Sequence, residues 1–144
     1  MIFRDTIEQM LDGSKTQTRR LSKEGDVAHF QWFYGENRLC KVTRNGRLKW
    51  EVGRIYAIQP KRGANNLGYF KLLAIRWEEL QDITEADAIA EGIERNVRFY
   101  KSPDRALRNV IAQFIHLWDS IHKKPGDCWL GNPSVWVLTF ELVK

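Results

Sequence analysis

The spacing of apolar residues predicts three helices. A short one spans residues 6–13, with Thr6 as the N-cap of a capping box and a glycine at its end. A second spans residues 84–92 and begins with a similar box. The longest begins at Ser102-Pro103, an N-cap followed by proline. Its apolar residues recur at helical spacing, which is typical of a helix packed against a core: Leu107, Val110, Ile111, Phe114, Leu117, Trp118 and Ile121.

Strands are predicted between and after these helices. The clearest signal is a hairpin in which Lys41–Arg44 and Arg47–Trp50 flank Asn45-Gly46. This dipeptide tolerates the positive φ angles of a type I′ turn, so the two flanking runs should pair. Apolar runs that favour extended structure predict three further strands, over residues 54–58, 69–77 and 135–142.

The segment 22–37 has no clear strand pattern, and we interpret it as irregular. It contains an aromatic cluster, from His29 to Tyr34, that could be core or an exposed stacking surface; we expect core. Strands interleaved with two or three helices indicate an α+β fold, and the architecture we expect is a small barrel with helices around it. The length of 144 residues fits one domain, residues 1–144.

The net charge of +5 is unevenly distributed. Residues 1–62 hold 13 Lys and Arg against 7 Asp and Glu, whereas residues 63–144 hold 10 against 11. A basic region on an otherwise neutral domain indicates a polyanionic partner, although a basic surface can also serve solubility or protect an edge hairpin from aggregation. The residues that we expect to contact phosphate are Arg44, Arg47, Lys61 and Arg62.

Other features of the sequence restrict the class of protein. No apolar run approaches the ~20 residues that cross a bilayer, and the N-terminus lacks a signal-peptide layout, so we expect a cytoplasmic protein without membrane contact. Cys40 and Cys128 form no metal-type spacing with each other or with the three histidines, and we interpret them as free thiols. Neither a metal nor another cofactor is expected.

One short segment carries candidate chemistry. Lys15, Thr18, Arg19 and Arg20 lie within six residues, and a lysine amine can act as a base on a threonine hydroxyl if burial or nearby positive charge lowers its pKa. The two arginines could supply that charge, or bind a phosphate or a carbonyl. In a regular strand Lys15 and Thr18 would point to opposite faces, so their cooperation requires Lys15 to precede the strand. Spacing alone favours a polar turn leading into an exposed strand.

Glu91 is the acid that we pair with this segment. It lies in the last turn of the second predicted helix, where the negative end of the helix dipole disfavours a carboxylate. Such a position suits a proton donor. The alternative is an ordinary exposed glutamate.

Three segments carry a resemblance to a known family. Asp12 to Arg20 resembles the opening G-x-K-T-x-T-x-R motif of the ASCH domain family, a branch of the PUA-like superfamily. Ile83 to Ile93 resembles the family's second signature, and Phe114–Asp119 with Asn132–Val137 resembles the ending of bacterial and phage members. The resemblance implies a small PUA-like β-barrel with helices packed around it, an RNA-related function, and a basic hairpin insertion at about 38–52.

Some compact bacterial ASCH proteins are amidohydrolases that remove the acetyl group from N4-acetylcytidine. The resemblance implies that Lys15 is the proton acceptor, Thr18 the nucleophile and Glu91 the proton donor, and the last arginine of the motif falls on Arg20. This chain is longer than those enzymes and lacks an acidic segment of many phage-type members. The expected partner is RNA or a modified nucleoside, and the alternatives to hydrolysis are a non-catalytic RNA-binding module or a ribonuclease.

Overall fold

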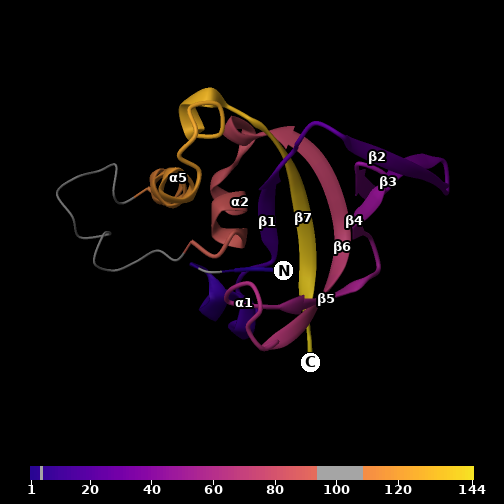
Figure 1. Cartoon of the computed structure of the whole chain (residues 1–144), viewed down its shortest axis with the longest axis horizontal. Coiled ribbons are helices and arrows are strands. Elements are labelled where there is room, and N and C mark those ends of the chain that lie inside the picture. Colours follow the sequence, from indigo (N-terminus) through magenta and orange to yellow (C-terminus); the bar gives the residue numbers. More distant parts are fainter. Residues whose placement is uncertain (4, 94–108) are drawn as a thin grey trace.

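The last strand of the chain lies at the centre of the fold. Strand β7 pairs antiparallel with both β1 and β6, and β5 pairs with β6, so the four-stranded sheet has the order β1-β7-β6-β5 (Figure 1). The bounds of these strands are β1 (Gln17–Leu21), β5 (Ile55–Ile58), β6 (Gly68–Glu79) and β7 (Ser134–Val143). The computed structural model describes residues 1–3, 5–93 and 109–144.

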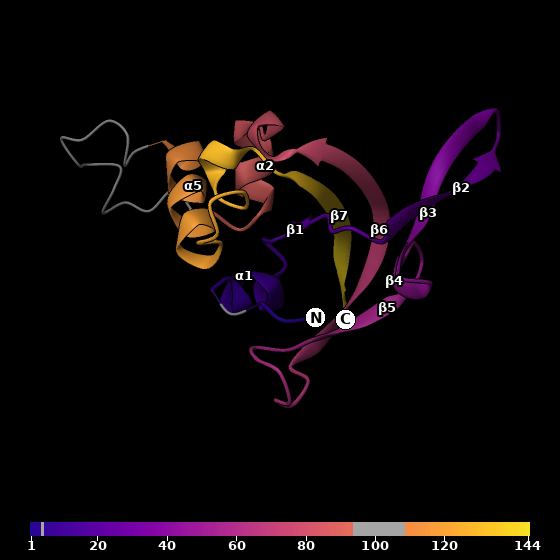
Figure 2. The ribbon, with the colours of Figure 1, turned by 45° about the horizontal axis from the view of Figure 1, so that its top comes forward.

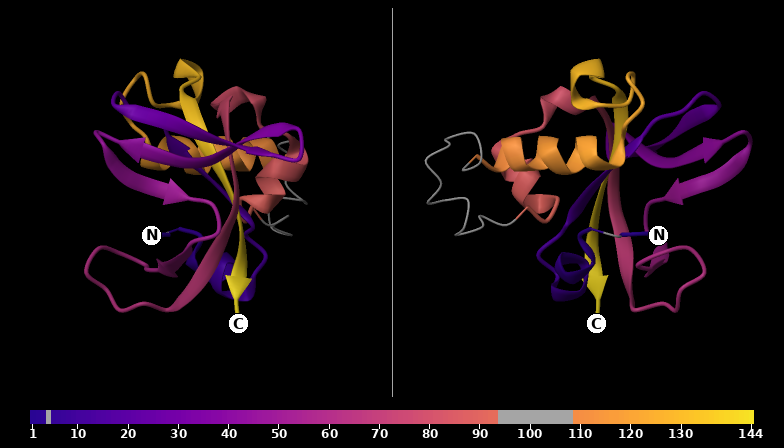
Figure 3. Two further views of the ribbon diagram at one scale, coloured as in Figure 1. Left: turned by 90° about the vertical axis from the view of Figure 1, so that its right-hand side faces the viewer. Right: turned by 60° about the vertical axis from the view of Figure 1, so that its left-hand side comes forward.

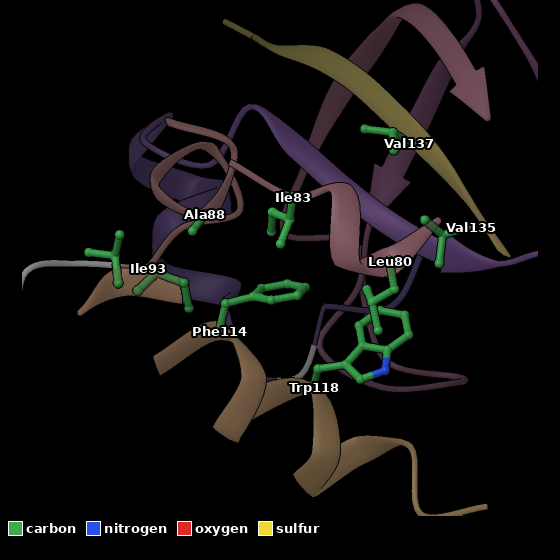
Figure 4. Close-up of a cluster of buried hydrophobic side chains, with 9 residues drawn as sticks. Leu80, Ile83, Ala88, Ile93, Phe114, Trp118, Val135 and Val137 are labelled. Atoms are coloured by element: carbon green, nitrogen blue, oxygen red, sulfur yellow. The ribbon is translucent and has the colours of Figure 1, made fainter. Parts of the chain in front are cut away.

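Both faces of β7 are buried because apolar residues occupy nearly every position of the strand. Val135 and Val137 face a cluster formed with the helices, in which Phe114 and Trp118 point toward the sheet (Figure 4). On the other face, buried residues of β7 pack against the second sheet and the N-terminal segment: Trp136, Leu138 and Phe140. A strand that is apolar on both sides therefore sits between two cores.

The second sheet contains three strands in the order β2-β3-β4. Their bounds are β2 (Asp26–Phe33), β3 (Glu36–Arg44) and β4 (Arg47–Glu51). The predicted hairpin at Asn45-Gly46 is confirmed, with φ angles of 52° and 78° at the two turn residues. This sheet lies on the side of the central sheet opposite the helices (Figure 3).

The expectation for residues 22–37 is wrong in two respects. Most of the segment is a strand, β2, which pairs with β3 through a second tight turn at Tyr34-Gly35 and has a register shift between His29 and Phe30. The aromatic side chains that we expected in the core are exposed, Trp32 by 68% and Tyr34 by 92%. They are exposed because the end of the β2–β3 hairpin projects away from the rest of the molecule (Figure 2).

The helices fall close to their predicted positions. They are α1 (Ile7–Asp12), α2 (Glu85–Ala90) and α5 (Val110–Ile121), with 3-10 turns η1 (Leu80–Asp82) and η2 (Trp129–Gly131). The capping box of α2 forms as predicted, but Thr6 makes no side-chain cap at α1. Helix α5 begins after an Asn109 cap; the predicted start at Ser102-Pro103 and the stripe residue Leu107 lie outside the described residues.

The predicted α+β class is confirmed, but the predicted barrel is not. The seven strands form two separate hydrogen-bonded sheets, and neither closes on itself in the described part of the chain. The apolar stripe of α5 is largely confirmed, since Val110, Phe114 and Trp118 are buried, whereas Ile121 is exposed. No helix in the described ranges is long and apolar enough to cross a membrane.

Candidate functional site

Lys15 lies in the connection between α1 and β1. Gly13, with a φ of 83°, ends the helix in the left-handed conformation, and the strand begins only at Gln17. The Lys15 amide donates to the Gln9 carbonyl at 3.0 Å, which holds the connection against α1. The geometric condition for cooperation is therefore met, because Lys15 precedes the strand that carries Thr18.

Lys15 forms a buried ion pair with Glu91, which ends α2. The Lys15 Nζ atom lies 3.0 Å from Oε2 of Glu91 and 2.6 Å from its backbone carbonyl oxygen, and the two side chains are 4% and 7% exposed. Burial lowers the pKa of Lys15, the charge and hydrogen bond of Glu91 oppose this, and the charges of Arg20 and Arg19 lower it further. Lys15 is thus an amine whose hold on its proton is weakened by burial.

Arg19 is fully buried among carboxylates. Its guanidinium contacts Glu78, Asp87 at 3.2 Å and Glu91 at 3.2 Å, and it also donates to the Gln17 side chain at 2.8 Å. These contacts occupy the terminal nitrogens that we expected to bind a phosphate or carbonyl. Arg19 instead contacts Oε1 of the Glu91 carboxylate, whereas Lys15 contacts Oε2.

Arg20 is the cation that remains available. One terminal nitrogen donates to the Ile2 carbonyl at 2.8 Å, the guanidinium lies 5.2 Å from the centre of the Phe3 ring, and the Nε atom is buried without a hydrogen-bond partner. Within the described ranges, no carboxylate forms an ion pair with Arg20, in contrast to Arg19. A partly buried cation without a carboxylate in contact can bind an anion or a carbonyl oxygen.

These side chains line one cavity of about 560 Å³. Its polar wall contains Lys15, Thr18, Arg19, Arg20 and Glu91. Its other walls are mainly apolar and come from the N-terminal segment, β1 and α5: Ile2, Phe3, Leu21, Phe114, Leu117, Trp118 and Ile121. Asp5, Thr6, Ser120 and His122 also line the cavity. Convergent polar groups beside apolar walls in a cavity of this size are typical of a small-molecule site.

The contribution of α5 to the cavity was missed in the sequence. Trp118 and His122 both line it, and their rings lie 3.9 Å apart between centroids. Burial lowers the pKa of His122, the nearby charge of Asp127 opposes this, and the imidazole is thereby favoured as a neutral ring. Their spacing of four residues places both side chains on one face of a helix, and this was the available signal.

The four basic residues predicted to contact phosphate lie outside the cavity. Arg44 pairs with Asp26 at 2.6 Å and lies over the Trp50 ring, whereas Arg47, Lys61 and Arg62 are exposed. The predicted site residues therefore fall into two groups. The residues between Lys15 and Arg20 that we predicted, together with Glu91, line the cavity, whereas the basic residues of the hairpin and the loop lie outside it. No group of three or more His, Cys, Asp or Glu side chains in the described part of the chain is placed to hold a metal ion.

Comparison with known proteins identifies the fold. No protein-family model and no curated protein matches the sequence significantly. The structure is similar to an ASCH domain of Lactobacillus crispatus, with a TM-score of 0.53, 13% identity and coverage of 95% of this chain and 69% of that one. It is likewise similar to a DUF984 protein of Enterococcus faecalis, with a TM-score of 0.53, 14% identity and coverage of 96% and 69%. The fold is therefore ASCH-like.

Proposed function

We propose that this ASCH-like chain is an amidohydrolase that removes the acyl group from N4-acetylcytidine or a related modified nucleoside. The observation that carries the proposal is the buried Lys15–Glu91 pair, which shares one cavity with the Thr18 side chain. A hydroxyl, an amine and a carboxyl group are the side-chain groups that covalent acyl transfer uses as nucleophile, base and acid. The reaction begins when the proton of the Lys15 ammonium moves to the Glu91 carboxylate across their 3.0 Å contact, which leaves a neutral amine and a carboxylic acid.

The first half of the reaction transfers the acyl group to the protein. The Thr18 hydroxyl oxygen attacks the amide carbonyl carbon while its proton moves to the Lys15 amine. The carbon–nitrogen bond then breaks, and the leaving N4 nitrogen takes the proton of Glu91. Cytidine departs, and the protein holds an ester on Thr18 beside a Lys15 ammonium and a Glu91 carboxylate, the charge state in which the two side chains attract each other.

The second half regenerates the protein. Water attacks the ester carbon and gives one proton to the Glu91 carboxylate, while the Thr18 oxygen leaves and takes the proton of the Lys15 ammonium. The products are the free carboxylic acid and the original threonine hydroxyl, amine and carboxylic acid. No cofactor takes part in these proposed reaction steps.

Arg20 and the apolar walls complete the proposed site. In both halves negative charge develops on the former carbonyl oxygen, and a pre-positioned cation stabilises such charge more strongly where water is excluded. Arg20 is suited to this because it lines the cavity without an acidic partner in contact. The aromatic residues Phe3 and Trp118 offer surfaces for the flat pyrimidine ring.

No residue of the basic hairpin at about 38–52 lines the cavity. We therefore propose that residues 1–144 act as one domain in which this hairpin is an insertion outside the active site. The free nucleoside is then a sufficient substrate, and the reaction does not require the hairpin.

The proposal is tested by incubating the purified protein with N4-acetylcytidine and following the release of cytidine by liquid chromatography. We expect turnover by the natural chain and a loss of at least about 100-fold in kcat/KM for Lys15→Ala, because the proton acceptor is removed. Lys23→Ala is the matched control, since Lys23 is exposed and lies outside the cavity. The absence of turnover, or full turnover by Lys15→Ala, contradicts the proposal.

A further inference from the structure

The end of the β2–β3 hairpin carries a group of exposed aromatic side chains. We call residues Asp26–Arg44, which comprise β2, β3 and their turn, the aromatic arm. Its exposed aromatic residues are Phe30, Trp32, Phe33 and Tyr34. Figures 1 and 2 show the arm extending beyond the central sheet, so its end lies away from the other elements. Large exposed apolar groups that are clustered in this way mark an interaction surface.

The strand pairing explains why these rings remain uncovered. Phe30 is opposite Leu39 in the ladder, and Trp32 is opposite Asn37. Leu39 still packs against the cluster between the two sheets, but Trp32, two pairs further along, is exposed. The arm is therefore longer than the core that supports it, and its final pairs extend into solvent.

The charge around the arm is strongly positive. Residues 36–62 hold eight Lys and Arg against two acids, Glu36 and Glu51. Each of these acids already pairs with an arginine, Arg38 at 3.4 Å and Arg54 at 3.5 Å. Exposed cations without such a partner in the described ranges include Arg47, Lys61 and Arg62. Charged residues in this number are unfavourable at the centre of a protein–protein interface and favourable beside phosphates.

Cations are also crowded at the base of the arm, which likewise favours a partner that carries phosphates. Partial burial lowers the pKa of Lys49, the charges of Arg44, Lys23 and Arg20 lower it further, and the charge of Asp26 opposes this. Lys49 also lies 5.5 Å from the Trp50 ring centre. An anion placed here would relieve the repulsion between these side chains.

The rings of the arm lie beside one another and beside a cation. The Arg38 guanidinium lies 4.6 Å from the centre of the Phe33 ring, and Phe33 meets Tyr34 edge to face at 4.6 Å. Aromatic rings and arginine planes beside a cationic surface are the elements that bind unpaired bases. Paired bases are already stacked in a duplex and cannot use such rings.

We propose that the aromatic arm binds single-stranded nucleic acid, with bases stacked on Trp32 and Tyr34 and phosphates beside the cations of residues 36–62. This binding is independent of the proposed hydrolysis, because no residue of the arm lines the cavity. A failure of one proposal is therefore distinguishable from a failure of the other. The cavity governs cytidine release, and the arm governs the affinity for an oligonucleotide.

The test is fluorescence anisotropy of a labelled, unstructured oligonucleotide titrated with the full chain, made once as RNA and once as DNA. We expect binding that weakens steeply with salt and a lower affinity for the duplex of the same sequence. The double variant Trp32→Ala, Tyr34→Ala should raise Kd by at least about tenfold. Its cytidine release from N4-acetylcytidine should equal that of the natural chain, which also shows that the variant is folded.

Tyr69→Ala is the matched control, because Tyr69 is an exposed aromatic residue of β6 outside the arm. It should leave the affinity unchanged. Three results overturn the inference: no binding of either strand, equal affinity of the arm variant and the natural chain, or a dimer in sedimentation that Trp32→Ala dissociates. The last result would assign the arm to a second copy of the chain.

Discussion

Lys15 is an amine that folding removes from water and places against a carboxylate 76 residues away. Such a pair is weak evidence for stability, because desolvation of two charges offsets most of their attraction. A buried lysine with a lowered pKa that lines the same cavity as a threonine is, however, what the proposed covalent catalysis needs. At the scale of single residues, the pair therefore fits the proposed chemistry better than a stabilising role.

Arg19, in contrast, contributes to stability, and a substitution can test this role. Arg19→Met leaves three carboxylates, on Glu78, Asp87 and Glu91, without their shared buried cation. We expect the free energy of unfolding to fall by about 3–5 kcal/mol, measured by urea denaturation. Arg76→Met is the matched control, since Arg76 pairs with Glu78 and Asp87 from a half-exposed position and should cost less than about 1 kcal/mol. Equal losses for the two variants would contradict this role.

At this scale the sequence predicted which residues gather, but not what each does. Lys15, Thr18 and Glu91 do line one cavity, as the resemblance of the motifs implied. Arg19 and Arg20 were indistinguishable in the sequence, because adjacent residues of a strand face opposite sides and nothing local indicates which side holds the acids. The difference depends on Glu78 and Asp87, which come from β6 and α2.

At the scale of elements, the two hairpin turns show where local chemistry is informative. Asn45-Gly46 was predictable because both residues tolerate positive φ. Tyr34-Gly35 was not, because a tyrosine with a φ of 46° is unfavourable and gives no turn signal. The missed turn made β2 look irregular, and its aromatic residues were then assigned to the core by their hydrophobicity alone.

Asp26 joins the second sheet to the central one. Its carboxylate accepts from Arg44, from the Lys23 amide at 2.9 Å and from Nε1 of Trp136 in β7 at 2.9 Å. Burial opposes ionisation, but these hydrogen bonds and the Arg44 charge outweigh it and lower the pKa of Asp26 to about 2. These hydrogen bonds between the sheets therefore favour the ionised form of Asp26.

The contribution of Asp26 should depend on pH with a definite sign. Because its pKa is lower in the folded state than its ordinary value of 3.8, the stability that it adds is present above about pH 4 and is lost as the pH falls toward about 2. Near neutral pH, Asp26→Asn should cost at most about 2 kcal/mol of unfolding free energy, and the difference should shrink toward about pH 2. Urea denaturation at both pH values measures it, with exposed Glu24→Gln as control. A difference that stays constant with pH would contradict the account.

At the scale of the whole molecule, different elements form the two candidate surfaces. The cavity lies among α5, the N-terminal segment and β1, whereas the aromatic arm extends from the second sheet (Figure 3). The sequence predicted the α+β class from interleaved strands and helices. It did not predict two separate sheets, because the pairing of β1 with β7 joins the ends of the chain, and no local pattern specifies such a partner.

The central claim is that the cavity performs acyl transfer through Thr18. The most direct measurement compares kcat/KM for N4-acetylcytidine between Thr18→Ala and Thr16→Ala, two substitutions of one chemical kind two residues apart. Thr18 is buried in the cavity wall, and Thr16 is exposed. The account predicts a loss of at least about 1000-fold for Thr18→Ala and an unchanged rate for Thr16→Ala. Equal activity of the two variants would contradict it.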